Sequence, residues 1–402
     1  MAETSAARAA HHRAVAAEIR EKTEKILPEI AARAGETEAL RRVPDANIAA
    51  LRQAGWFTAF LPARYGGQEL DILSFYELLP MIGQVCPSTA WATMLLGIHT
   101  QGAAMFSEKA QDELWADAPD TLLSSSLAPV GKVTPVEGGL RISGRYRFST
   151  GCDHARWAII GSAHADPATG KIEARMNLVP ATDYAIDDAS WHVTGMSGSG
   201  SKDLVLEDVF VPEHRSELTQ ALNSYAARGH QVNRDPLYRC AFGPFFAYGL
   251  SAASIGIAEG VIAAYTAHQG KRISAFTGGT VAESTPAYMR LAEAAQEVDC
   301  AKLMLRRDMS DLMAAAETEH VLDYAATTRM RCNATYVTEL CTRAVDRLFR
   351  ASGGMALQRD NHLQRAFRDM HGAAAHAFSD YDVARQIYGR LLLGLPPAGN
   401  LA

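Results

Sequence analysis

The sequence predicts an α+β multidomain protein, with an N-terminal helical domain over residues 1–120, a central antiparallel β-barrel or sandwich over residues 121–215, and a C-terminal four-helix bundle over residues 216–402. Three observations support this fold class. Apolar residues recur at helical spacing toward both ends, polar and apolar residues alternate between them, and strands and helices do not alternate along the chain. A doubly wound βαβ fold is therefore not expected.

The N-terminal region is helical in pattern as far as about residue 105, with an interruption at Pro44. Two helices are expected over residues 72–85 and 89–105, the second with Ser88 as its N-cap. The second helix is nearly all apolar, which predicts burial on every side. His99 lies in it, and on this pattern alone a core histidine held by one hydrogen bond is the favoured interpretation.

Alternation of polar and apolar residues marks the strands of the central unit. Residues 171–178 alternate at every step, as in a strand with one face in solvent. A second alternating segment covers residues 140–148, interrupted by Ser143 and Gly144. Further strands are expected over residues 122–127, 158–163 and 204–211.

Long helices return after Pro212. The pattern predicts helices over about residues 245–270, 286–316, 320–349 and 361–393. Helices of about thirty residues exceed the usual length nearly threefold, which indicates a long helical bundle. The last helix carries His371 and His376 among small or apolar residues, so we expect a closed site that contains titratable groups.

Composition and charge exclude several classes of protein. With 48% hydrophobic residues and a formal net charge of −6, the 402-residue chain is expected to be soluble and has no basic character suited to nucleic acid. No signal peptide and no membrane-spanning run of about eighteen apolar residues is expected. The six cysteines form no CxxC pair, so we expect reduced thiols, no metal site and a cytoplasmic location.

Several motifs, in order along nearly the whole chain, resemble the acyl-CoA dehydrogenase fold family. They are the LPARYGG segment at residues 61–67, the end of the β unit at residues 194–212, and Gly353-Gly354 followed by Arg368-Asp369. The resemblance implies a flavin held between the β domain and the C-terminal bundle, in a homotetramer.

The expected catalytic base of a dehydrogenase is absent from the sequence. Many members of that family place a glutamate eight residues after the aspartate of the Arg-Asp pair, and this chain has Ala377 there. Other members place it in the first bundle helix, where this chain has Phe245, Phe246 and Tyr248. Without such a base, α,β-dehydrogenation of an acyl thioester has no evident proton acceptor.

A closer resemblance is to the oxygenase components of two-component flavin-dependent monooxygenases, in the manner of 4-hydroxyphenylacetate 3-hydroxylase. It is carried by residues 148–157 (FSTGCDHARW), by the helix with His99, and by His376 seven residues after Asp369. The resemblance implies diffusible reduced FMN or FAD from an NAD(P)H-dependent flavin reductase, reaction with O2 to a C4a-hydroperoxyflavin, and hydroxylation of a small phenolic or indolic substrate.

The resemblance also suggests residues for the flavin site. Ser149 takes the position of a hydroxyl beside flavin N5, although a serine that caps a strand end is the alternative. Trp157 would shield the ring or serve packing alone. Strand neighbours face opposite sides, so only some of the serines at 124–126 can face the site, and Ser126 is the expected one.

Contacts to the flavin tail are expected from Arg272 and from the Gly353-Gly354 pair, through which a neighbouring subunit would approach the cofactor. A helix C-cap alone would also explain one of these glycines. The Gly-Ser run at residues 195–200 could bring backbone N–H groups to a phosphate or form a simple loop. FMN and FAD remain equally compatible.

His376 is the expected base or peroxide hydrogen-bond partner, since a neutral imidazole suits removal of a phenol proton near pH 7. On a continuous helix it shares a face with Asp369 and Asp380, either of which would fix its tautomer. His371 lies about 140° away and is expected at the rim. Within this family His99 becomes a substrate-side residue.

The substrate pocket is expected to be shaped by Phe246, Tyr248 and their neighbours, together with His99, Ser126 and His376. Three functions remain open: an aromatic oxygenase, an acyl-CoA dehydrogenase-type enzyme with a displaced base, and a flavin-fold protein used only for binding. N- or S-oxygenation is a variant of the first.

Overall fold

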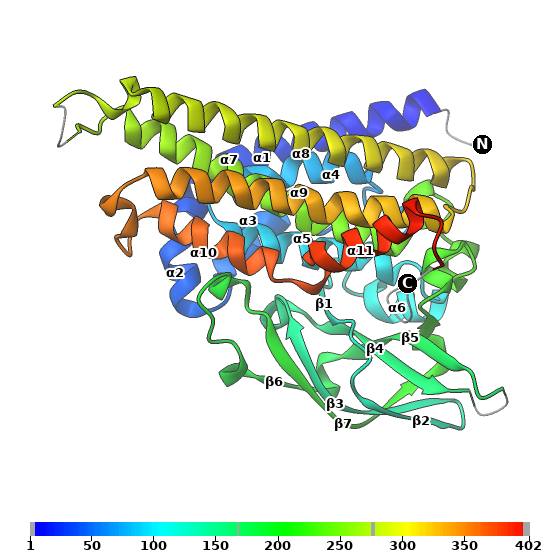
Figure 1. The fold of residues 1–402 in the computed structure, drawn as a ribbon. Coiled ribbons are helices and arrows are strands. Elements are labelled where there is room, and N and C mark those ends of the chain that lie inside the picture. Colours follow the sequence, from blue (N-terminus) through cyan, green and yellow to red (C-terminus); the bar gives the residue numbers. More distant parts are fainter. Residues whose placement is uncertain (1–4, 167–168, 275–277, 397–402) are drawn as a thin grey trace.

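The computed structural model describes residues 5–166, 169–274 and 278–396. The helices from both ends of the chain pack into one thick helical layer, and the strands form a separate unit along one side of it (Figure 1). One large apolar core joins the N-terminal helices to the C-terminal bundle, and a smaller core fills the β unit. The predicted order of helices, β unit and helical bundle is confirmed.

Helices form the N-terminal third because apolar residues recur at helical spacing. Their bounds are α1 (Ser5–Ala32), α2 (Ala34–Leu40), α3 (Asp45–Gln53), α4 (Ile72–Gly83), α5 (Pro87–Ala103) and α6 (Glu108–Trp115). Every residue of α5 is buried, as the sequence predicted. The expectation that Ser88 caps α5 was wrong, because Pro87 takes the first helical position and Cys86 is the N-cap.

The β unit is a sandwich of two four-stranded sheets, ordered β1-β4-β5-β8 and β2-β3-β7-β6, with apolar side chains packed between them. Its strands are β1 (Leu123–Ser126), β2 (Lys132–Val136), β3 (Gly139–Ser149), β4 (Trp157–Ala165), β5 (Ile172–Pro180), β6 (Ala185–Asp187), β7 (Lys202–Pro212) and β8 (Ser216–Leu218).

Two features of the sandwich differ from the expectation. Strand β1 pairs with β4 in parallel, so the first sheet is mixed rather than antiparallel. Sequence alternation missed β2, β6 and β8, which are short and lie at sheet edges, where fewer contacts impose a pattern. Pro135 in β2 is compatible only with such an edge position.

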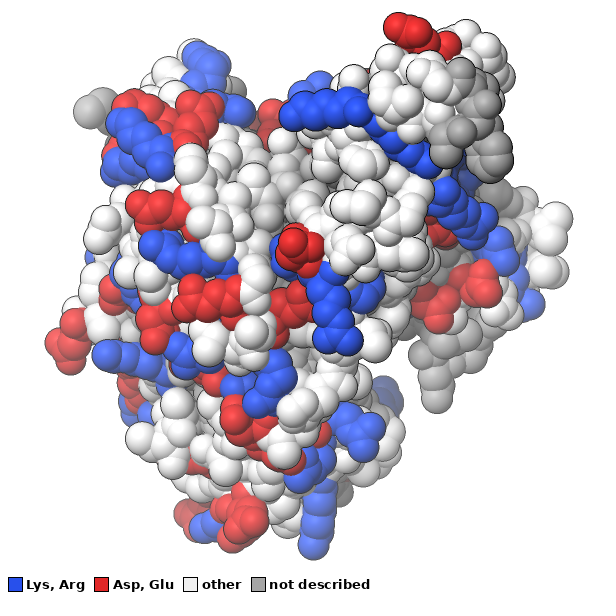
Figure 2. Space-filling model, turned by 90° about the vertical axis from the view of Figure 1, so that its left-hand side faces the viewer, with Lys and Arg blue, Asp and Glu red and all other residues white. Residues whose placement is uncertain are grey.

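The C-terminal bundle contains α7 (Phe242–Gln269), α8 (Thr285–Glu317), α9 (Tyr324–Ala351), α10 (His362–Ala374) and α11 (Tyr381–Leu392). Helix α7 is long and apolar enough to cross a membrane, but 89% of its most apolar stretch is buried inside the protein, as in a core helix. On the face of the molecule shown in Figure 2, acidic and basic side chains are interspersed.

The predicted continuous helix over residues 361–393 is wrong, because the chain breaks between α10 and α11. Helix α10 ends at Ala374, and His376 caps a single turn, Ala377–Ser379, through a bond from the Phe378 N–H to Nδ1 at 3.1 Å. Asp380 then caps α11 by accepting the Val383 N–H. Two side-chain caps in close succession stabilise this break.

Candidate active site

A cavity of about 770 Å³ lies between loops of the β unit and the C-terminal end of α10. Its wall combines aromatic rings, small residues and hydroxyls. The lining residues are Trp91, Phe148, Thr150, Trp191, Val193, Thr194, Gly195, Met196, Ser199, Ser201, Phe367, Arg368, His371, Gly372, Ala375, His376 and Ala377. No carboxylate is among these described residues, and Ala377, at the expected position of a dehydrogenase glutamate, is on the wall.

The pair Arg368 and Asp369 fastens the β unit to α10 and so fixes one wall of this cavity. Arg368 donates to the Thr194 carbonyl at 2.6 Å, and Asp369 accepts the Met196 N–H at 2.6 Å. A Cβ on Gly195 would lie 2.0 Å from the Arg368 carbonyl, so glycine is needed for this close approach. Within the Gly-Ser run, Gly195 is therefore explained by the close contact of this loop with α10.

Burial raises the pKa of Asp369 to about 7. Between the ordinary carboxyl pKa and 7, the folded protein holds a proton that the unfolded chain releases, so this group makes stability fall as pH rises. Relative to D369N, the wild-type free energy of unfolding should therefore drop by about 2–3 kcal/mol from pH 5 to pH 8. Urea unfolding of wild type and D369N at several pH values measures these free energies. An equal pH response of the two proteins would contradict the raised pKa of Asp369.

His376 is a neutral hydrogen-bond donor in this geometry. Its Nδ1 accepts the Phe378 N–H, which leaves the ring proton on Nε2. Burial lowers the pKa of His376 to about 4, so the ring is neutral at pH 7. The expectation that Asp369 or Asp380 fixes the tautomer is wrong, because both carboxylates bind backbone N–H groups elsewhere.

His371 also lines the cavity but is largely exposed. Its Nε2 lies 3.0 Å from Asp346 Oδ1 of α9, so it forms a surface ion pair when protonated. Its position at the edge of the cavity agrees with the rim position predicted from helical geometry.

His99 and Ser125 form a buried hydrogen-bonded pair. The His99 Nδ1 lies 2.9 Å from the Leu123 carbonyl and must donate to it, so Nε2 accepts from the Ser125 hydroxyl at 2.8 Å. Burial lowers the pKa of His99 to about 4. Ser126, the expected site serine, instead donates to the Arg147 carbonyl at 2.7 Å. Of the serines at 124–126, Ser125 and not Ser126 therefore contacts His99.

Phe246 lies between the two histidines. Its ring is 6.4 Å from His99 and 6.2 Å from His376, and it also meets Phe378 at 5.0 Å. Trp91 approaches His376 from another side at 5.7 Å. The predicted pocket residues Phe246, His99 and His376 are thus brought together by α7, α5 and the turn after α10.

Tyr248 does not join this group. Its hydroxyl donates to the buried carboxylate of Asp308, which also binds Arg329 at 2.8 Å and Asn333 at 2.7 Å. The polar end of Tyr248 therefore belongs to a network inside the bundle, and substrate binding by this residue stays a prediction.

Three hydroxyls line the cavity in a chain: Thr150 to Ser201 at 2.7 Å, and Ser199 to Ser201 at 2.8 Å. Two contacts use two of their three protons, so one O–H remains free to donate into the cavity. Ser149, the expected flavin N5 partner, is fully buried and does not line this cavity. Thr150 follows the end of β3 at Ser149, and it is the residue of this pair that lies on the cavity wall.

If this cavity holds the reduced flavin that the family resemblance implies, replacing Thr150 by valine should raise the hydrogen peroxide released per flavin about tenfold, because a cavity hydroxyl worth roughly 1–1.5 kcal/mol is lost at constant shape. S149A is the matched control, expected to leave this ratio unchanged. Peroxide assays with reduced flavin measure this ratio for both variants. Equal effects of T150V and S149A would contradict the assignment of Thr150, rather than Ser149, to the cavity wall.

The remaining predicted cofactor residues lie elsewhere. Trp157 is half-buried beneath the guanidinium of Arg215, whose Cζ is 4.9 Å from the ring centroid. Arg272 donates to the Ala351 carbonyl at 3.0 Å, and a Cβ on Gly353 would lie 2.6 Å from its Nη2. Arg272 and Gly354 line a separate cavity of about 680 Å³ near the N-terminal end of α10.

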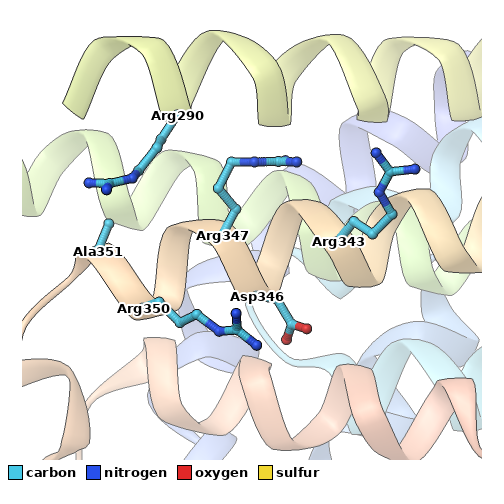
Figure 3. Close-up of a pocket in the computed structure, with 6 residues that line it drawn as sticks. All are labelled: Arg290, Arg343, Asp346, Arg347, Arg350 and Ala351. Carbon is cyan, nitrogen blue, oxygen red and sulfur yellow. The ribbon is translucent and has the colours of Figure 1, made fainter. Parts of the chain in front are cut away.

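A further cavity of about 450 Å³ lies on the bundle surface, where α8 and α9 present four arginines (Figure 3). Arg343 binds Glu297 at 2.8 Å, and Arg347 binds Glu293 at 3.0 Å. Acidic neighbours thus offset part of the positive charge of this cavity.

Both helical ends of the chain match acyl-CoA dehydrogenase family models. The N-terminal domain model covers residues 9–117, and the C-terminal domain model covers residues 248–381. Fold and cavity thus define a protein of the acyl-CoA dehydrogenase class.

Individual similar proteins identify a narrower group within this class. The chain is 40% identical to p-hydroxyphenylacetate 3-hydroxylase, oxygenase component, of Acinetobacter baumannii, over 94% of this chain and 89% of the relative. It is 37% identical to the flavin-dependent monooxygenase oxygenase subunit HsaA of Mycobacterium tuberculosis, over 94% and 96% of the two chains. XiaF from Streptomyces sp., solved with FADH2 and glycerol, superimposes with a TM-score of 0.89 at 29% identity, covering 97% and 98%. The chain therefore belongs to the oxygenase components of flavin-dependent monooxygenases.

Proposed function

We propose that this protein hydroxylates a small phenolic or related aromatic compound, using O2 and reduced FMN or FAD. One observation carries the proposal: a neutral imidazole with a free Nε2–H, from His376, stands on the wall of a cavity that has no carboxylate among its described lining residues. Such a wall offers no base for a carbon acid, but it offers a donor to oxygen.

The residues of the 770 Å³ cavity fit a flavin ring. Phe148 is 63% exposed and adopts a left-handed φ of 65°, and it faces Trp191 at 6.2 Å. An exposed aromatic held in strained backbone at a cavity mouth is typical of a ligand site. Bound reduced flavin supplies the electrons that activate dioxygen. Thr150, Ser199 and Ser201 then provide hydroxyl contacts, and the aromatic wall excludes water.

His376 carries its ring proton on Nε2, because its Nδ1 accepts the Phe378 N–H, and would donate that proton to the reacting oxygen. A donor fixed in a water-poor site stabilises developing negative charge without reorganisation. This supports a role as hydrogen-bond donor, in preference to the role of base.

The His99–Ser125 pair is the better acceptor for a phenol proton. The phenol O–H donates to Ser125 Oγ while the Ser125 proton is shared with His99 Nε2, and the Leu123 carbonyl keeps His99 oriented. This increases phenolate character, which makes the ring a better nucleophile toward electrophilic oxygen.

We further propose a cytoplasmic homotetramer that receives reduced flavin from a separate NAD(P)H-dependent reductase. The cavity lined by Arg272 and Gly354 supports a tail site shared between subunits, because about 20 Å of α10 separates it from the flavin cavity. The six free thiols are compatible with a reducing compartment.

Anaerobic titration with reduced FMN and reduced FAD tests the cofactor, followed by mixing with oxygen and a panel of phenols and indoles. We expect binding of reduced flavin and one hydroxylated product per flavin oxidised. Tight binding of oxidised FAD with reduction by an acyl-CoA, and no hydroxylation, would overturn the proposal.

A further inference from the structure

A second cavity, of about 520 Å³, lies between α9, α11 and the turn that joins α10 to α11. It shares Ala375, His376 and Ala377 with the flavin cavity, so this short segment forms a wall of both. The other residues that line the second cavity are mostly polar, whereas aromatic and apolar groups make up much of the flavin cavity. The second cavity is therefore suited to a ligand of different chemistry.

The Thr338 hydroxyl is a buried polar group of the second cavity that lacks a partner. Thr338 is 2% exposed, and its Oγ1 has no hydrogen-bond partner among the described residues. The neighbouring threonines of this cavity are satisfied, because Thr335 donates to the Cys332 carbonyl and Thr342 to the Thr338 carbonyl, both at 2.8 Å. A buried hydroxyl without a partner costs free energy, so a ligand that bonds it is stabilised there.

Negative charge predominates in the lining of the second cavity. Glu339 is half-buried and has no hydrogen-bond or ion-pair partner in the part of the chain that the structure describes. Asp380 caps α11, and Asp382 binds Arg385 at 2.7 Å. Three carboxylates thus accompany one guanidinium on this wall, and the charge of Glu339 is left unpaired.

Other basic groups nearby do not supply a counter-charge from the wall. His376 lines the cavity, but burial lowers its pKa to about 4, so the ring is neutral at pH 7. Arg331 lies over the Phe378 ring, 5.7 Å from its centre, and is not among the residues that line the cavity. The unpaired carboxylate therefore favours a cation over an anion as the ligand.

We propose that the second cavity binds a small organic ammonium ion, with its ammonium group held by the Glu339 carboxylate and the Thr338 hydroxyl. An ammonium group offers three donors and no acceptor, which suits two oxygen acceptors, and its bond to a carboxylate is charge-assisted. The cavity volume lies within the range of small-molecule sites and leaves room for the organic group. This site is distinct from the flavin cavity and does not rest on the proposed function.

Three probes that share one ring and differ in charge test the proposal on the full-length protein. They are cyclohexylammonium, cyclohexanol and cyclohexanecarboxylate, and titration calorimetry gives each dissociation constant. We expect the ammonium ion to bind about tenfold more tightly than the alcohol. This is the lower end for a hydrogen bond to a charged group, because Glu339 is only half-buried. The carboxylate should bind more weakly than the alcohol.

The variant E339Q should remove the preference for the ammonium ion, by weakening the ammonium ion about tenfold and leaving cyclohexanol unchanged. D346N is the matched control. Asp346 lies two turns further along α9, where it binds His371 at 3.0 Å and lines a different cavity. D346N removes the same charge from the same helix, and it should keep the preference.

A second pair of variants locates the site through the hydroxyl and serves if E339Q does not fold. T338V, which keeps the shape of the side chain, should weaken the ammonium ion and the alcohol by about 2- to 10-fold, the value of one neutral hydrogen bond. T342V is its control, because the Thr342 hydroxyl lines the same cavity but is already bonded to the Thr338 carbonyl. It should leave both dissociation constants nearly unchanged.

The proposal would be overturned if wild-type protein bound the ammonium ion and the alcohol equally, or showed no saturable binding of the ammonium ion. Equal loss of the preference in E339Q and D346N would also overturn it, because the preference would then come from the net charge of the protein. Unchanged binding of both probes by T338V would place them outside the second cavity.

Discussion

The variant H376A is expected to form at least about 100-fold less hydroxylated product per reduced flavin oxidised, because loss of one preorganised donor to a developing oxyanion costs that much. The Phe378 N–H donates to His376 Nδ1 and so keeps the ring proton of His376 on Nε2. Among the described residues, no other side chain accepts the Phe378 N–H. Flavin oxidation should continue, so the missing product should be replaced by hydrogen peroxide. Product analysis together with a peroxide assay measures both.

H371A is the matched control for this variant. His371 lines the same cavity, on α10, but its ring binds Asp346 at the surface. We expect near wild-type product yield from it. If H371A lost product while H376A kept it, the assignment of the two histidines would be reversed. If H376A kept product and changed only peroxide release, His376 would not be the donor on which oxygen transfer depends.

The variant S125A is expected to lower the rate of phenol hydroxylation by about 100-fold, the contribution typical of a positioned proton acceptor. Removing the hydroxyl breaks the path from a phenol to His99 Nε2 and leaves that buried nitrogen without a partner. Electron-rich substrates that carry no ionisable hydroxyl should be affected less. Single-turnover rates with a phenol and its methyl ether measure this difference.

S126A provides the control one residue along the same strand. Its hydroxyl donates to the Arg147 carbonyl, away from His99, so its loss should reduce stability by about 1 kcal/mol and leave the phenol rate nearly unchanged. A large loss of activity in S126A with an active S125A would instead support the serine expected from the sequence.

The fold was predictable because it follows from periodicity. Helical spacing identified α7, α8 and α9, and alternation identified the long strands, including β5. The end of α10 was not predictable in this way. Residues around His376 are small and good helix formers, and the break depends on His376 and Asp380 capping successive turns, a tertiary choice that periodicity does not record.

Two serines predicted for the site, Ser126 and Ser149, are direct neighbours of Ser125, which bonds His99, and of Thr150, which lies on the cavity wall. Alternation along β1 indicates that Ser125 and Ser126 face opposite sides, yet it does not indicate which of them meets His99. That choice is set by the pairing of β1 with β4 and by the docking of β1 against α5. A one-residue error in phase therefore exchanges a site residue for a structural one.

Tyr248 shows the same limit on a helix. Helix α7 is apolar around nearly its whole circumference, so no polar face indicates its orientation. Phe246 turned toward the histidines, and Tyr248 turned toward Asp308.

Oxygen transfer itself is tested most directly by a single turnover of the protein, loaded anaerobically with reduced flavin and a phenol, and then mixed with ¹⁸O₂. Mass spectrometry of the product gives the source of the new oxygen. We predict one ¹⁸O atom in each hydroxylated product, with one reduced flavin oxidised for each product formed. Product oxygen that comes from water, or complete flavin oxidation that yields only peroxide across the phenol and indole panel, would contradict oxygenation by this protein.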